Sequence, residues 1–164
     1  MKRAALAVAG VLVAMTGNAG ACATNPPMTT PAPADAARAA DIVAVIHVDH
    51  VARLTARERA ETDRMFTTAD GGFFVPPAPS VRFTVNRLLK GEVPVDALIR
   101  NGPTSCEVAL QQGGDYVLFA MKPQARGDRI VPMNGTFRLD KTPSAAAQLA
   151  AVESSLTHPD PNQP

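Results

Sequence analysis

Short segments with strand patterns recur through the middle of the chain, and turn residues separate them. They cover residues 41–51, 80–89, 96–100, 116–121, 129–133 and 136–139. From Ser80 to Leu89 apolar and polar residues alternate, with a slip at Arg87 and Leu88, which is typical of a strand with one face in a core and one in water. The stretch from Tyr116 to Met121 is apolar without interruption, which predicts a central strand covered on both faces. These patterns predict a mainly β domain built as a small barrel.

Glycine and proline dipeptides mark the turns. Residues 90–94 and 101–103 flank the third strand segment, which predicts a hairpin there. Asn134-Gly135 predicts a second, local hairpin because both positions tolerate positive φ. With Thr136 this dipeptide also matches a glycosylation acceptor, but we interpret it as a turn. Gly71-Gly72 and Gly113-Gly114 lack the strand, helix and lysine context of a phosphate loop and are also interpreted as turns.

Three segments have helical patterns. Residues 34–40 allow one short helical turn, and residues 144–156 have helical apolar spacing with Pro143 near the first turn. A charged helix from Thr55 to Phe66 is predicted, capped by Thr55 with Glu58 three positions later. This helix belongs to an insertion, residues 55–79, between two strand segments.

The amino terminus has the layout of an export signal. Residues 1–21 combine a basic start, a short apolar run from Leu6 to Met15 and small residues at Ala19 and Ala21. Cleavage after Ala21 would make Cys22 the first residue of the mature chain. We therefore expect the protein in the periplasm or outside the cell, or on the outer membrane as a lipoprotein.

Three fates of Cys22 remain open from the sequence. Its thiol could pair with Cys106, the other of the two cysteines, in an oxidising compartment. Alternatively, Ala19-Gly20-Ala21-Cys22 could act as a lipobox, which would attach lipid to the Cys22 sulfur. A cut after Ala23 would instead remove Cys22 and leave Cys106 as a lone thiol.

Composition narrows the partners and the organisation. The first 21 residues carry two of 16 basic residues and none of 15 acidic ones, so the remainder has a net charge of −1, which argues against nucleic acid. No apolar segment reaches the roughly 20 residues of a membrane span, so only lipid on Cys22 would attach the chain to a membrane. We expect a proline-rich arm at 22–34, one domain at 35–156 and a disordered tail at 157–164.

Catalytic or metal-binding constellations are hard to identify. His47 and His50 would lie on opposite faces of a strand, which argues against a shared metal ion. Ser105 beside Cys106 has no recognisable nucleophile motif. The candidate carboxylates Glu58, Glu61 and Asp63 fall in the charged helix and are interpreted as a solvated face. The sequence therefore predicts a protein without enzymatic activity, cofactor or metal.

Several segments together resemble the tissue-inhibitor-of-metalloproteinases and netrin-like family. They are residues 39–43, 83–91, 102–106 and 114–120, and the similarity extends over roughly residues 22–140. The resemblance implies a five-stranded, partly open Greek-key barrel of the oligonucleotide- and oligosaccharide-binding (OB) type, here with a C-terminal helix. It also implies an exported, non-enzymatic module whose partner is a protein.

The resemblance further implies roles for the cysteines. In the animal inhibitors the first residue is a cysteine whose amine and carbonyl chelate the protease zinc, and Cys22 matches it, followed by Ala23 at the position that enters the protease pocket. A Cys22–Cys106 bridge would stabilise the fold by about 4.5 kcal/mol. Thr24 replaces a second cysteine of the family, so one anchor is missing. The implied function is metalloprotease inhibition, and the alternative is a lipid-anchored envelope protein with a structural or protein-interaction role.

Overall fold

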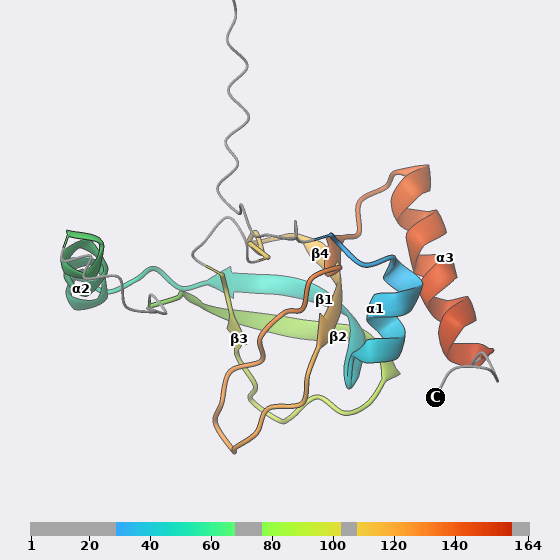
Figure 1. Ribbon diagram of the computed structural model, residues 1–164, viewed down its shortest axis with the longest axis horizontal. Helices are drawn as coiled ribbons and strands as arrows, with labels where there is room; N and C mark the ends of the chain where they lie inside the picture. The colour runs from blue at the N-terminus through green and yellow to red at the C-terminus, as the bar shows by residue number, and fades with distance from the viewer. Residues whose placement is uncertain (1–28, 68–76, 103–107, 159–164) are drawn as a thin grey trace, which may run out of the picture.

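The computed structural model describes residues 29–67, 77–102 and 108–158. A curled antiparallel sheet forms a half-barrel, with strand order β3-β2-β1-β4-β5 (Figure 1). The elements are α1 (Pro33–Ala39), β1 (Ile42–Val51), α2 (Ala56–Thr67), β2 (Ser80–Lys90), β3 (Ile99–Arg100), β4 (Asp115–Ala120), β5 (Phe137–Arg138) and α3 (Pro143–Thr157). The predicted mainly β fold with a C-terminal helix is confirmed.

β1 is the middle strand, and both of its faces are largely buried over residues 42–48, whereas Asp49 and His50 near its end are exposed. Side chains of successive strand residues point to opposite faces, so Ile42 and Ile46 join an apolar cluster inside the half-barrel with Leu118 of β4. Val43 and Phe119 join a second cluster on the outer face, beneath the helices. β4 contributes side chains to both clusters, so it is also buried on both faces. This burial explains its uninterrupted apolar run from Tyr116, as the sequence predicted.

Helices α1 and α3 lie side by side and cover the outer face (Figure 1). Their small residues, including Ala36 and Ala37, are buried against the sheet together with Val152. The α3 cap follows the sequence signal, because Thr142 accepts the Ala145 N–H at 3.2 Å and Pro143 occupies the first turn.

Helix α2 lies apart from the helix pair (Figure 1), and its predicted cap is confirmed. Glu58 accepts the Thr55 N–H at 2.7 Å, and Thr55 Oγ1 accepts the Glu58 N–H at 3.2 Å. These two hydrogen bonds form a capping box, in which each residue satisfies a backbone donor of the other.

The third strand is shorter than predicted. Only Ile99–Arg100 pairs with β2, because a turn occupies the start of the expected segment 96–100. The Ala97 N–H donates to the Pro94 carbonyl at 3.2 Å, and Asp96 has φ +58°. Residues 96 and 97 therefore belong to the turn that precedes β3.

β2 also departs from strict alternation. Val81 is buried, but Val85 and Leu88 are 37% and 46% exposed. β3 covers only the first two residues of β2, and the β1–β2 register shifts after Val43 and again after Val45. Bulges of this kind break the two-residue period, which is why part of the apolar face reaches solvent.

The predicted local hairpin around Asn134-Gly135 is wrong in its pairing, although the turn is present. Residues 132–138 run along β4 as one interrupted strand, with Pro132 opposite Ala120 and Phe137 opposite Val117. At the interruption the Phe119 N–H donates to Thr136 Oγ1 at 3.1 Å. A side chain there replaces the missing backbone acceptor, so the turn interrupts the pairing without leaving this buried donor unpaired.

The segment around Ile130 joins the two sides of the half-barrel. Ile130 forms a parallel bridge with Ile99 of β3, and its carbonyl accepts the Arg100 N–H at 2.8 Å. Two residues later Pro132 bridges to β4. Ile130 is fully buried in the interior cluster, so this segment closes the apolar core on its open side.

Candidate binding site

The residues singled out by the resemblance lie outside the described part of the chain. These are Cys22, Ala23 and Cys106, together with Thr24; Ser105 and Gly71-Gly72 lie outside it as well. The described residues on either side of segment 103–107 are joined by a buried side chain. Asn101 Oδ1 accepts the Leu110 N–H at 2.7 Å, and Asn101 Nδ2 donates to the Leu110 carbonyl at 3.1 Å. The chain thus enters and leaves the Cys106 segment from two positions fixed against each other.

His47 is paired with a carboxylate across the sheet. Its Nδ1 lies 2.7 Å from Asp115 Oδ1, and the two residues are cross-strand neighbours on β1 and β4. His50 is exposed opposite Arg82. Among the described residues no three His, Cys, Asp or Glu side chains are placed to hold a metal ion together.

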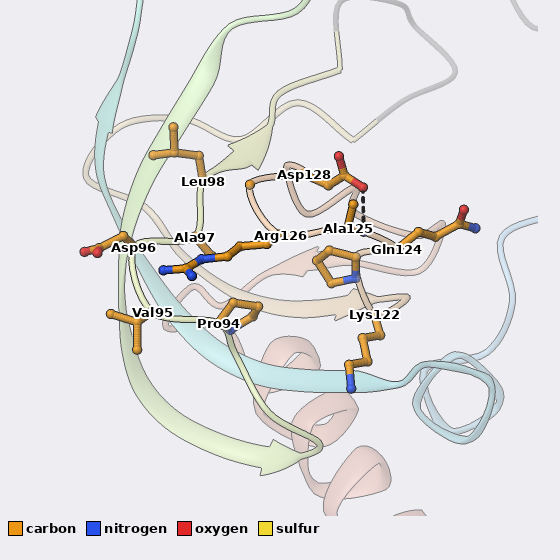
Figure 2. A pocket seen from close by; sticks show the side chains of 12 residues that line it. Pro94, Val95, Asp96, Ala97, Leu98, Lys122, Gln124, Ala125, Arg126 and Asp128 are labelled. Atoms are coloured by element: carbon orange, nitrogen blue, oxygen red, sulfur yellow. Dashed lines mark hydrogen bonds between the residues drawn. The ribbon is translucent and has the colours of Figure 1, made fainter.

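Two loops at one end of the half-barrel enclose a pocket of about 430 Å³ (Figure 2). We call it the loop pocket. It is lined by residues 94–98, between β2 and β3, and by residues 122–128, after β4. The Pro94–Ala97 turn displays Val95, whose side chain is 91% exposed. From the other loop, the Arg126 side chain extends across the pocket toward this turn (Figure 2).

A second pocket, of about 530 Å³, lies beside residues 122–124, which line both pockets, and we call it the basic groove. It is lined by Arg100, Met121, Lys122, Pro123, Gln124, Asp128, Arg129, Val131, Pro132 and Met133. Met121 and Val131 are 52% and 53% exposed, which is high for large apolar side chains. The lining thus contains three cationic side chains and one carboxylate.

Local hydrogen bonds hold the shared loop in place. At the start of the loop, the Lys122 N–H donates to Asp41 Oδ2 at 2.9 Å. The Ala125 N–H donates to Asp128 Oδ2 at 2.9 Å, and the intervening Gly127 has φ +91°. Such a turn needs glycine at the left-handed position. The two pockets therefore lie against a structured loop.

Arg129 fixes the far side of the basic groove. Its guanidinium donates to the Ala78 carbonyl at 2.7 Å and to Ser80 Oγ at 3.2 Å. Both acceptors are neutral, and no ion pair joins Arg129 to a carboxylate within the described residues, so neutral groups hold the positive charge at this position. The groove consequently combines apolar walls with an immobilised cation.

Sequence reasoning missed both pockets. It interpreted residues 90–94 as a turn and gave residues 122–128 no role. The one local signal is Val95, an apolar residue directly after the turn segment 90–94. Met121 and Val131 lie inside the predicted strand segments 116–121 and 129–133, where apolar residues are expected and give no signal. A scan against protein-family models gives no match, and no curated protein is detectably similar to the chain. In the described ranges no helix has the length and apolar character needed to cross a membrane.

Proposed function

We propose that the protein is an exported, non-enzymatic module that binds another protein through the loop end of its half-barrel. One observation carries this proposal. Of the five large apolar side chains exposed among the described residues, three line the two pockets: Val95, Met121 and Val131. Grouped exposed apolar residues with polar neighbours are typical of interaction sites, whereas scattered ones need no explanation.

The fold supports a barrel of the OB type. The Ile130 segment runs parallel to β3 and antiparallel to β4, which is the pairing that a partly open Greek-key barrel uses to close. The Lys90-Gly91 dipeptide of the resemblance has a clear structural role. Lys90 Nζ donates to the carbonyls of Ala37 and Arg38 at the end of α1, at 3.3 and 2.9 Å. These features support a protein resembling the metalloproteinase inhibitors and netrin-like domains.

The specific form of the proposal is metalloprotease inhibition through the amine and carbonyl of Cys22, with Ala23 at the protease pocket and a Cys22–Cys106 bridge holding the terminus. An extra alanine before Cys22 removes the free amine at that position. Inhibition of a zinc endopeptidase by the mature protein is expected to disappear in this extended form, while thermal stability stays unchanged. Equal inhibition by both forms would refute the chelation mechanism.

The intact mass of the protein purified from its own cells, before and after reduction, separates the fates of Cys22. A chain that begins at Cys22 and is lighter by two hydrogen atoms until reduced contains the Cys22–Cys106 bridge. A large hydrophobic increment on Cys22 identifies the lipid-anchored envelope protein instead, and ends the chelation mechanism. A chain that begins after Ala23 also ends it.

Site-specific cross-linking tests the binding role directly. A photoreactive amino acid that replaces Val95 or Met121 is expected to cross-link the protein to a single partner protein in intact cells, with one partner molecule per chain. The matched control is the same amino acid at Val85, which is exposed on β2 away from the pockets. Equal capture from Val85, or no partner from any position, would contradict the proposed surface.

A further inference from the structure

We infer that the basic groove recognises an acidic, apolar peptide segment of the partner protein. This inference rests on the proposed function and states which chemistry the partner presents. The groove offers Met121 and Val131 as apolar contacts, with Arg100, Lys122 and Arg129 around them. A partner segment with aliphatic side chains between Asp or Glu residues would complement both.

The charge around the groove favours anions. Asp128 is the one carboxylate in the lining, and its Oδ2 already accepts the Ala125 N–H at 2.9 Å. Lys122 lines both pockets, and its ammonium group makes no hydrogen bond or ion pair within the described residues. An incoming carboxylate could therefore pair with the Lys122 ammonium without first displacing another group from it.

Carboxylates on neighbouring elements offset part of this positive charge. Glu58 of α2 is close enough to Arg129 for the guanidinium to contribute to the lowering of its pKa, after the larger effect of the Thr55 hydrogen bonds. Asp96 lies in the loop pocket on the opposite side of the shared loop and does not line the groove. Asp41, whose Oδ2 accepts the Lys122 backbone N–H at 2.9 Å, is a further carboxylate beside the lining, so the cation offered to a ligand is chiefly the Lys122 ammonium.

The apolar walls favour a peptide over a simple polyanion. Met121 and Val131 are each about half exposed, and Pro123, Pro132 and Met133 extend the apolar lining between them. Burial of such side chains supplies affinity in a protein interface, whereas charges around its rim mainly govern association rate and specificity. A sulfated polysaccharide would use the cations and leave the apolar side chains in water.

A display library of random peptides of about ten residues, selected against the folded domain, tests the inference without knowledge of the partner. Enriched peptides are expected to place Asp or Glu beside Leu, Ile, Val, Met or Phe. Their affinity should fall about tenfold in Met121→Ser and threefold to tenfold in Lys122→Glu, and should weaken with salt. Amide shifts on peptide binding should centre on residues 121–133.

Matched controls separate the groove from the general surface. Lys141→Glu reverses an exposed lysine before α3, and Leu88→Ser removes an exposed apolar side chain on β2. Both should bind the peptides like the unaltered protein. Circular dichroism checks the fold of each variant, and Lys122→Gln replaces Lys122→Glu if charge reversal disturbs it.

Several results would overturn the inference. They are failure to enrich any peptide, enrichment of neutral or basic peptides, equal losses in Lys122→Glu and Lys141→Glu, and heparin binding as tight as the peptides with no effect of Met121→Ser. A partner captured through Val95 or Met121 that docks a neutral segment would overturn this inference but keep the proposed function. Peptide binding at the groove without a cellular partner would sustain the groove chemistry and remove the proposed function.

Discussion

A Cβ atom placed on Gly91 would overlap the carbonyl oxygen of Asp41 and lie 3.1 Å from its carbon. Gly91 also has φ +76°, which disfavours any side chain. The end of β2 therefore approaches the start of β1 so closely that only glycine fits. Together with Lys90 at the end of α1, this contact explains the Lys-Gly dipeptide by packing and capping.

Gly91→Ala is expected to lower the free energy of unfolding by more than about 3 kcal/mol, because it adds a backbone overlap to the cost of positive φ. Gly113 is a matched control, since it has the same φ of +76° and nothing within 4 Å of an added Cβ. Gly113→Ala should cost only about 1 kcal/mol. Urea denaturation measures both, and equal losses would show that the overlap is relieved by movement of the backbone.

Asn101→Ala should lower the free energy of unfolding by about 2–3 kcal/mol. It removes both hydrogen bonds to Leu110 and leaves a buried N–H and a buried carbonyl without partners. Asn86→Ala, on the exposed part of β2, is the control and should change stability by less than about 0.5 kcal/mol. Chemical denaturation compares them. A small effect of Asn101→Ala would mean that water takes over its role.

Thr136→Val should cost about 1–2 kcal/mol, because valine has nearly the shape of threonine but cannot accept the Phe119 N–H. Thr136→Ser keeps the hydroxyl and should retain most of the stability. Amide exchange of Phe119 is the direct measurement, and it should accelerate in the valine variant alone. Similar exchange in both variants would show that the hydrogen bond to the Thr136 hydroxyl is not what protects the Phe119 amide.

The start of α2 should depend on pH. Hydrogen bonds from the Thr55 backbone and side chain hold the pKa of Glu58 below its ordinary value of 4.5. A carboxyl group with a lowered folded-state pKa stabilises the fold above its unfolded pKa, and this contribution is lost as pH falls through the folded-state pKa. We therefore expect the Thr55 and Glu58 amides to lose protection in acid, as followed by NMR.

Glu58→Gln keeps a capping acceptor but removes the titrating group. In this variant the loss of protection at the start of α2 should no longer follow pH in that range. Persistence of the same transition would assign it to another acidic residue. Global stability should change little, because α2 lies apart from the helix pair (Figure 1).

Local signals in the sequence predicted the local structure well. The Thr55–Glu58 cap, the short first helix and Pro143 in the first turn of α3 depend on hydrogen bonds and dihedral preferences within a few residues. Strands β1 and β4 were predicted because their apolar runs reflect burial on both faces. Such features need no knowledge of distant partners.

The pairing of the final segments and the candidate site were decided by tertiary structure. Asn134-Gly135 favours a turn equally well in a hairpin or in an interrupted strand, and only the free edge of β4 determined the second outcome. Val95, Met121 and Val131 are ordinary apolar residues in the sequence. They form a candidate site because the curled sheet brings two loops, about 25 residues apart in the chain, to the same end of the half-barrel. The sequence of a loop carries little information about which distant loop it will approach.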